Sequence, residues 1–232
     1  MATLDFGRFE ALTFDCYGTL IDWETGIARG LRAALGDGVQ ASDDGLLELY
    51  GRREAELEAG PYITYREVLA RACAGVGRTH GIEVTDDAAR RFAGSVGEWP
   101  AFPDSAEALA RLATRFRLGV LTNCDDDLFA LSEKRLRVRF EWVVTAQQVR
   151  SYKPSPRHFL VAFERMDVPR DRILHVAQSL FHDHVPARRL GLASAWIDRR
   201  HDRAGSGATP PAAATPDLTA PDMVTFADLA LA

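Results

Sequence analysis

The sequence has few cysteines and no long apolar run. Its three cysteines, Cys16, Cys73 and Cys124, are too scattered for a disulfide framework or a zinc knuckle. We interpret them as small, semi-buried apolar residues in a reducing compartment. No stretch approaches the roughly 18 apolar residues of a membrane span, and the N-terminus has neither a basic segment nor a long apolar one. We therefore expect no signal peptide and a cytoplasmic location.

Clusters of basic residues are also missing. The formal net charge is -5 and no run of Lys or Arg occurs, which argues against nucleic acids and anionic membranes as partners. Hydrophobic residues make up 47% and charged residues 26% of the 232 residues, as in an ordinary globular protein. A chain of this length can bury a large core without a disulfide or a metal ion, and it can hold one domain or a domain with an insert.

Short apolar runs that end in polar turns alternate with helical patterns. The run 9–14 stops at the polar turn 15–19, and the runs 117–121 and 173–177 end in the same way, which is typical of buried strands. Amphipathic helical patterns lie at 105–115, 126–135, 156–166 and 181–190. This alternation predicts an α/β fold with a Rossmann-like parallel sheet core. In such a sheet, ligands bind beyond the carboxyl ends of the strands.

The segment 21–100 interrupts this alternation. Its apolar residues recur three or four apart, which predicts four amphipathic helices, at 27–35, 45–58, 65–76 and 86–99. We interpret 21–100 as a helical cap domain inserted into a catalytic core that comprises 1–20 and 101–232. Within the core, the segment 205–221 is rich in Pro, Ala, Thr and Gly and predicts a loop or an extended connector. The segment 224–231 predicts a last short helix or strand.

Side chains that can carry chemistry follow the predicted strands. They are the carboxylates of Asp15 and Asp183, the ammonium group of Lys153, and the hydroxyl or amide groups of Thr19, Thr122, Asn123 and Ser179. A lysine beside an aspartate keeps the carboxylate ionised, and a carboxylate nucleophile divides a difficult displacement into two easier steps. The alternative interpretation is that Asp15 merely caps the turn that follows it.

Four segments stand in the order and at the spacing of the motifs of a known family. FDCYGTL (14–20), LTNC (121–124), YKP (152–154) and VAQSLFHD (176–183) resemble the four motifs of the haloacid dehalogenase superfamily. The resemblance covers the whole chain, cap included. It implies that Asp15 is the nucleophile and that Lys153 steadies the charges around it. It also implies that Thr122 and Asn123 bind substrate and that Asp183 belongs to the last motif.

Two departures from the superfamily pattern predict the type of reaction. Phosphatases of the superfamily carry a second aspartate two positions after the nucleophile, as the acid for the leaving alkoxide, and Tyr17 stands there. Their fourth motif includes an acidic residue that helps to hold magnesium, and Gln178 stands there. Because a Mg²⁺ site normally needs one or two carboxylates besides the phosphate, these changes argue against phosphatase chemistry. We expect no metal ion and no cofactor.

The first motif, D-x-Y-G-T, resembles that of the (S)-2-haloacid dehalogenases. A halide leaves without a proton, and hydroxyls and N–H groups at helix N-termini can hold the substrate carboxylate. The resemblance implies that Asp15 displaces the halide from the α-carbon of a short 2-haloalkanoic acid and forms an ester. Water activated by Asp183 then releases the 2-hydroxy acid. The catalytic residues would be Asp15, Lys153 and Asp183.

The leaving halide needs hydrogen-bond donors as its charge develops. Arg53 and Asn123 are the halide-binding residues by resemblance, and the alternative for Arg53 is an exposed charge on a helix. His182 is a third candidate, although a lone histidine in a loop is more often structural. The expected substrate-binding set is Tyr17, Thr19, Arg53, Thr122, Asn123, Gln178, Ser179 and His182, with Trp23 lining the pocket or packing at the cap junction.

Positions that orient water in the dehalogenases also differ in this chain. Phe159 stands where the family has a tyrosine, and Leu180 where it has an asparagine. We therefore expect Gln178, Ser179 and His182 to share that role. Because fluoride depends on short, well-directed hydrogen bonds, the expected donors also suggest fluoroacetate-type substrates as a hypothesis.

Three other functions stay open at this point. The chain could be a phosphatase of a small metabolite, which magnesium would stimulate, or a binding module that keeps the fold without the chemistry. It could also be a hydrolase with the same mechanism that opens another carbon electrophile, such as a strained ring bearing a carboxylate. Helical caps in this family can form dimer faces, so we expect a homodimer.

Overall fold

A parallel β-sheet forms the centre of the core in the computed structural model, which describes residues 4–36, 38–203, 205 and 207–232. The strand order is β3-β2-β1-β4-β5-β6, and every neighbouring pair is parallel. The strands are β1 (Ala11–Phe14), β2 (Arg117–Thr122), β3 (Trp142–Thr145), β4 (Ile173–Ala177), β5 (Ala193–Ile197) and β6 (Leu218–Ala220). The α/β fold with a Rossmann-like parallel sheet is thus confirmed.

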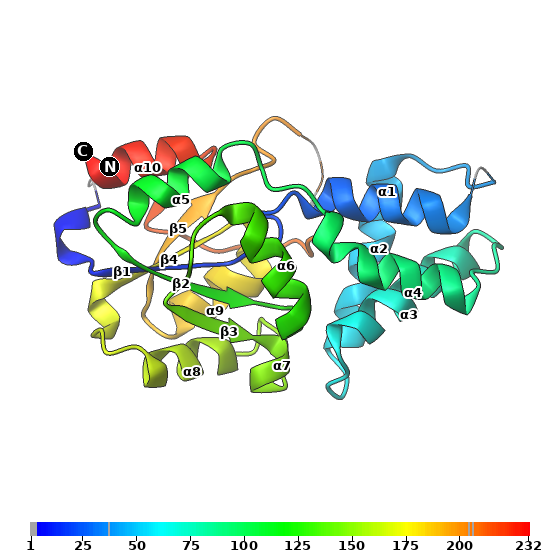
Figure 1. Cartoon of the computed structure of the whole chain (residues 1–232), viewed down its shortest axis with the longest axis horizontal. Coiled ribbons are helices and arrows are strands. Elements are labelled where there is room, and N and C mark those ends of the chain that lie inside the picture. Colours follow the sequence, from blue (N-terminus) through cyan, green and yellow to red (C-terminus); the bar gives the residue numbers. More distant parts are fainter. Residues whose placement is uncertain (1–3, 37, 204, 206) are drawn as a thin grey trace.

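Helices cover both faces of this sheet (Figure 1). They are α5 (Ser105–Leu112), α6 (Asp126–Leu136), α7 (Ala146–Val149), α8 (Arg157–Arg165), α9 (Val185–Arg189) and α10 (Met223–Leu231). Successive residues of a strand point to opposite faces. Leu12 and Phe14 of β1 accordingly join the core cluster that contains α5 and α10, whereas Ala11 joins a second cluster with α8.

Parts of the core differ from the expected elements. β3, β5 and β6 were not expected; β6 pairs with β5 inside the segment that predicts a loop or connector. In place of a helix over 181–190, a π-helical turn, Leu180–His184, leads into the short α9. Pro186 lies in the first turn of α9, where its missing N–H costs no helical hydrogen bond. The last expected element, 224–231, is the helix α10.

The cap consists of four helices between β1 and α5. They are α1 (Trp23–Leu35), α2 (Asp43–Glu58), α3 (Tyr65–Thr79) and α4 (Asp86–Gly94). A 3-10 turn, Ser95–Glu98, replaces the end of the expected helix 86–99. Each cap helix is preceded by an Asp, Ser or Thr residue whose side chain accepts a hydrogen bond from a backbone N–H of the first turn. The four helices lie together at one end of the molecule, beside the sheet (Figure 1).

The chain enters and leaves the cap through two adjacent segments. Ile21 and Ala101 form an antiparallel bridge, and the N–H of Asp22 donates to the Pro100 carbonyl at 2.8 Å. Close to this bridge, the N–H of Phe102 donates to the Leu20 carbonyl at 3.0 Å. We propose these crossings as the boundaries of the cap, for which the sequence predicts a division at 21 and 100.

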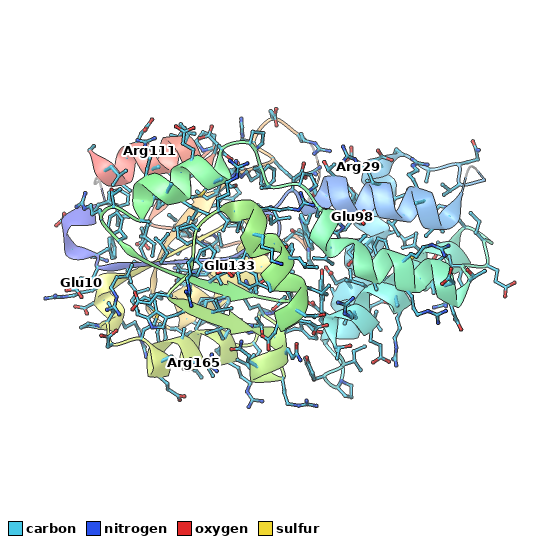
Figure 2. All side chains as sticks on the ribbon, viewed as in Figure 1. Glu10, Arg29, Glu98, Arg111, Glu133 and Arg165 are labelled. Atoms are coloured by element: carbon cyan, nitrogen blue, oxygen red, sulfur yellow. The ribbon has the colours of Figure 1, made fainter. Side chains whose placement is uncertain are left out.

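Charged side chains lie on the outside of both parts. Glu10, Arg29, Glu98 and Arg165 are exposed and extend away from the packed interior (Figure 2). Among the helices of the described residues, none is long and apolar enough to cross a membrane.

Candidate active site

The carboxyl ends of three central strands meet at one edge of the sheet. Phe14, the last residue of β1, is in register with Val120 of β2 and Val176 of β4. Asp15 therefore lies beside the last residues of these two neighbouring strands, which end at Thr122 and Ala177. This edge faces the cap, and it is where an α/β sheet normally binds its ligand.

Asp15 is held by two hydrogen bonds to its carboxylate. Oδ1 accepts from Lys153 Nζ at 2.9 Å, and Oδ2 accepts from the Thr19 hydroxyl at 2.8 Å. The Thr19 hydroxyl in turn accepts from the N–H of Gln178 at 2.9 Å. Burial raises the pKa of Asp15, the nearby Lys153 opposes that rise, and the charge of Asp183 adds to it. Asp15 is thus an oriented carboxylate with a basic, reactive oxygen.

Lys153 lies between the two aspartates. Its ammonium donates to Asp15 Oδ1 at 2.9 Å, to Asp183 Oδ1 at 2.7 Å and to the Leu121 carbonyl at 2.8 Å. These bonds use all three donors of the ammonium group. Burial alone would lower the pKa of Lys153, but the two carboxylates outweigh burial and raise it. Lys153 therefore stays charged although its side chain is 1% exposed.

Asp183 presents one engaged oxygen and one without a partner. Oδ1 accepts from Lys153 and lies 3.0 Å from His175 Nε2. Oδ2 is buried and has no hydrogen-bond partner among the described groups. Burial would raise the pKa of Asp183, but Lys153 and His175 outweigh it and hold the pKa below its ordinary value. Asp183 is therefore ionised and can accept a hydrogen bond from a bound water through Oδ2.

A small chamber of about 30 Å³ lies above this triad, between core and cap. Of the residues expected from the sequence, its wall contains Asp15, Tyr17, Trp23, Asn123, Lys153, Ser179, His182 and Asp183. Arg53, Thr122 and Gln178 are not part of this wall, and Thr19 lies behind Asp15. This volume is small, since a cavity needs roughly 10–15 Å³ on this measure to hold one water, and it favours a short ligand.

Arg53 does not reach the chamber, contrary to its expected role as a halide ligand. Its guanidinium donates to Glu56 Oε2 at 2.9 Å and lies 3.5 Å from the Thr79 hydroxyl, and its side chain is 41% exposed. Successive residues of an α-helix are turned by about 100°. Because α2 turns Glu54 and Glu58 into the chamber, Arg53 is turned toward α3.

Thr122 and Gln178 also depart from their expected roles. The Thr122 hydroxyl is buried without a partner among the described groups, but it lies outside the chamber wall. The Gln178 side chain accepts a hydrogen bond from the Thr209 hydroxyl at 3.3 Å and lines a larger cavity of about 1110 Å³ beside the loop 207–212. Thr209 belongs to the walls of both cavities, so this pair separates the chamber from the larger cavity.

Asn123 and His182 line the chamber, and the Asn123 amide and one ring nitrogen of His182 already make hydrogen bonds. Asn123 Nδ2 donates to Glu58 Oε2 at 3.2 Å and to the Lys153 carbonyl at 3.1 Å. His182 Nδ1 lies 3.1 Å from the Ser179 hydroxyl. Burial lowers the pKa of His182 to about 4, so the imidazole is neutral at neutral pH. Neither residue presents a positive charge to a leaving halide.

Tyr17 contributes its ring, and its hydroxyl is engaged elsewhere. The hydroxyl lies 3.0 Å from the Ser132 hydroxyl and accepts from Cys124 Sγ at 3.3 Å. Gly18 follows with a φ of 91°, and a Cβ there would lie 3.0 Å from Trp23 Nε1. Glycine is therefore required at this turn, both for the left-handed backbone and for the close approach of Trp23.

Two buried glutamates of α2 were not among the expected site residues. Glu54 Oε1 accepts from the Tyr50 and Tyr65 hydroxyls at 2.8 and 2.9 Å, and burial raises its pKa to about 7. Glu58, one turn further, reaches Asn123. A signal existed in the sequence, because Leu47, Tyr50, Glu54 and Glu58 recur three or four apart and continue the apolar face of the helix.

The chemistry of the assembled groups fits nucleophilic attack by a carboxylate. One aspartate is oriented, one lysine neutralises it, and a second aspartate can hold water. Among the described residues, no group of three or more His, Cys, Asp or Glu side chains is arranged to hold a metal ion.

Known proteins resemble this chain over most of its length. It is 26% identical to (S)-2-haloacid dehalogenase 4A of Burkholderia cepacia, over 82% of this chain and 83% of that protein. It is 30% identical to the 5-amino-6-(5-phospho-D-ribitylamino)uracil phosphatase YigB of Escherichia coli, over 82% of this chain and 84% of that protein. The structure of L-2-haloacid dehalogenase from Xanthobacter autotrophicus superposes with a TM-score of 0.80 at 22% identity, over 95% of this chain and 98% of that one.

A family model places the chain more firmly than any one of these pairs. The model of the haloacid dehalogenase-like hydrolases matches residues 9–180, which include the strand-end motifs around Asp15, Asn123 and Lys153 as well as the whole cap. The chain therefore belongs to the haloacid dehalogenase-like hydrolases.

Proposed function

We propose that this protein is a hydrolytic dehalogenase of short 2-haloalkanoic acids that forms an ester on Asp15 and releases 2-hydroxy acids. The observation that carries the proposal is the position of Lys153 Nζ, bonded to both Asp15 and Asp183. This bridge supplies a nucleophile and a water-binding carboxylate in one rigid unit. The small chamber and the relatives named 2-haloacid dehalogenases support a short substrate.

The displacement uses Asp15. An oxygen of its carboxylate attacks the α-carbon, the carbon–halogen bond breaks, and the halide leaves with the electron pair. Lys153 stays bound to Asp15 and favours its ionised form before attack. No cofactor takes part in this proposal.

The hydrolysis uses Asp183. Its unpartnered Oδ2 accepts a hydrogen bond from a water molecule and orients that water toward the Asp15 ester. The low pKa of Asp183 keeps it ionised throughout the cycle. Attack on the ester carbonyl then returns Asp15 as a carboxylate and gives the 2-hydroxy acid and a proton.

Isotope labelling in a single turnover tests this proposal. Enzyme in excess is mixed with (S)-2-chloropropionate in ¹⁸O-labelled water, and the lactate and the peptide containing Asp15 are weighed by mass spectrometry. We expect unlabelled oxygen in most of the product and the label in Asp15. Immediate labelling of the product indicates direct attack by water, and full turnover by a folded Asp15→Ala variant refutes the proposal.

A phosphatase is the second candidate, and the 30% identity to the phosphatase YigB favours it. Against it, the Tyr17 hydroxyl is bound to Ser132 and Cys124, and burial raises its pKa well above its ordinary value, so it is a poor acid for a leaving alkoxide. The Gln178 side chain binds Thr209. Magnesium-dependent cleavage of p-nitrophenyl phosphate that requires Asp15 would favour this candidate over the dehalogenase.

A further inference from the structure

Glu58 is a buried acid that the reaction described above does not use. It ends α2, its side chain is 6% exposed, and it lines the same chamber as Asp15. Oε2 accepts a hydrogen bond from Asn123 Nδ2 at 3.2 Å, whereas Oε1 is buried without a partner among the described groups. Because a buried polar atom without a partner costs free energy, Oε1 points to a bound molecule that completes its hydrogen bonding.

The chamber contains more acids than cations. The lining carboxyl groups are those of Asp15, Glu54, Glu58 and Asp183, and Lys153 is the one lysine or arginine among the lining residues. Lys153 already shares its charge between Asp15 and Asp183. An unpaired carboxylate in such a place is far costlier than the neutral acid. Glu58 therefore favours its protonated form.

The burial of Glu58 and the charges around it also favour its protonated form. Burial raises the pKa of Glu58 well above its ordinary value, and Glu54 raises it further. Lys153 and the hydrogen bond from Asn123 lower it without outweighing burial. Because Oε2 already accepts from Asn123, the carboxyl hydrogen belongs on Oε1, the oxygen without a partner.

We propose that Glu58, as a neutral carboxylic acid, is the cap's hydrogen-bond donor to the leaving atom and directs the enzyme toward fluorinated acids. It takes the role expected of Arg53. A neutral O–H donor suits fluoride, a small anion that depends on short, directed hydrogen bonds. A neutral Glu58 also spares an anionic substrate the repulsion of a further carboxylate. This inference rests on the proposed dehalogenase function.

The donor takes part in a balanced reaction. An Asp15 oxygen forms a bond to the α-carbon, the carbon–fluorine bond breaks, and fluorine leaves with the electron pair as fluoride bound to the Glu58 O–H. Water then adds to the ester carbonyl, and the ester bond to Asp15 breaks. The products are the 2-hydroxy acid, fluoride and one proton, and Glu58 keeps its own proton.

Several titratable groups face Glu58 and shape its pH dependence. They are Glu54 on the same helix, Tyr65 on α3, and Asp15, Tyr152, Lys153 and His182 in the core. Ionisation of Glu58 removes the O–H donor. The rate of fluoride release should therefore fall as the pH rises through the pKa of Glu58, and a variant that cannot ionise should lose this fall.

Two variants of Glu58 and one control separate the effect of its hydrogen-bond donor from the effect of its charge. Glu58→Gln keeps an N–H donor and cannot ionise, Glu58→Ala has neither group, and Glu83→Gln at an exposed glutamate of the cap is the matched control. Fluoride and chloride release from fluoroacetate and chloroacetate is measured by ion chromatography from acidic to alkaline pH. We expect Glu58→Ala to lower fluoride release about 100- to 1000-fold and chloride release less. Glu58→Gln should retain more activity and lose the alkaline fall.

Two results would overturn the inference. One is an equal loss of fluoride and chloride release in Glu58→Ala, and the other is a Glu58→Gln variant as inactive as Glu58→Ala at every pH. Infrared difference spectra of the wild type minus Glu58→Gln at neutral pH need no substrate. A carboxylic-acid carbonyl band supports the neutral Glu58, and its absence refutes it. If no haloacid forms an ester on Asp15 of the wild type, the proposed function itself fails, whatever the infrared band shows.

Discussion

The Asp125 carboxylate in the core accepts a hydrogen bond from the backbone N–H of Tyr65 in the cap at 3.0 Å. Its second oxygen accepts from the N–H of Arg66, also at 3.0 Å, and Asp125 is 3% exposed. Both N–H groups belong to the first turn of α3, where unsatisfied donors and the helix dipole favour a negative charge. Asp125, in the loop after β2, thus accepts hydrogen bonds from the N-terminus of α3 and attaches the cap to the core.

Replacing Asp125 should loosen this attachment. We expect Asp125→Ala to lower the free energy of unfolding by about 1–2 kcal/mol, as for the loss of a helix cap. It should also raise KM, because Tyr65 lines the chamber. Thermal unfolding and steady-state kinetics measure the two effects. Asp127→Ala is the control, since this exposed residue pairs with the Arg66 side chain and should cost less than about 1 kcal/mol. If the two variants lost the same unfolding free energy and had the same KM, the role of Asp125 would be contradicted.

Removal of the buried ammonium should abolish activity and make stability depend on pH. In Lys153→Met, Asp15 and Asp183 face each other without a neutralising charge, so their pKa values rise and a smaller fraction of Asp15 is in the ionised form that attacks. Removing one partner of a buried ion pair costs about 3–5 kcal/mol. The loss of stability should be larger at alkaline than at acidic pH, because protonation relieves the unpaired carboxylates. Denaturant unfolding at both pH values tests this, and a loss that does not depend on pH would contradict it.

Glu54 should make the folded protein less stable at alkaline pH. Burial raises its pKa from the ordinary 4.5 to about 7, although the Tyr50 and Tyr65 hydrogen bonds oppose the rise. A raised folded-state pKa contributes stability that is complete below the unfolded-state pKa and is lost as the pH rises through about 7. The unfolding free energy of the wild type should therefore decline between the ordinary pKa of 4.5 and the raised pKa of about 7. Glu54→Gln should remove most of this decline, which amounts to a few kcal/mol because one pKa unit corresponds to about 1.4 kcal/mol. Urea unfolding at a series of pH values measures it, and Glu83→Gln should keep the wild-type slope.

Replacing Arg53 tests whether α2 turns this residue away from the chamber. Its guanidinium is bound to Glu56 outside the chamber, so Arg53→Ala should change halide release by less than about threefold, as expected for an exposed ion pair. A fall of about 100-fold in kcat would instead match the loss of a donor to the leaving group. That outcome would restore the halide role expected from the sequence. Chloride and fluoride release by the variant should be measured under the same conditions as for Glu58→Ala.

Much of the core could be predicted from the sequence because its central strands are buried on both faces. β1, β2 and β4 are continuous apolar runs that end in polar turns, and their ends place Asp15 and Asn123 at one edge. The outer strands carry weaker signals. β6 is the tripeptide Leu218–Ala220 inside a segment rich in Pro, Ala, Thr and Gly, and Trp142 and Val143 of β3 are only half-buried. Pairing with a neighbour, rather than local pattern, makes these segments strands.

The sequence by itself determined that Asp15, Lys153 and Asp183 meet, because motif order and strand ends bring these three residues to one place. Only the tertiary structure decided which cap side chains join them. A helix turns about 100° with each residue, so a shift of one position separates Arg53, on the outside, from Glu54, on the inside. That rotation depends on how α2 packs against α3 and the core, and these contacts join residues far apart in the chain.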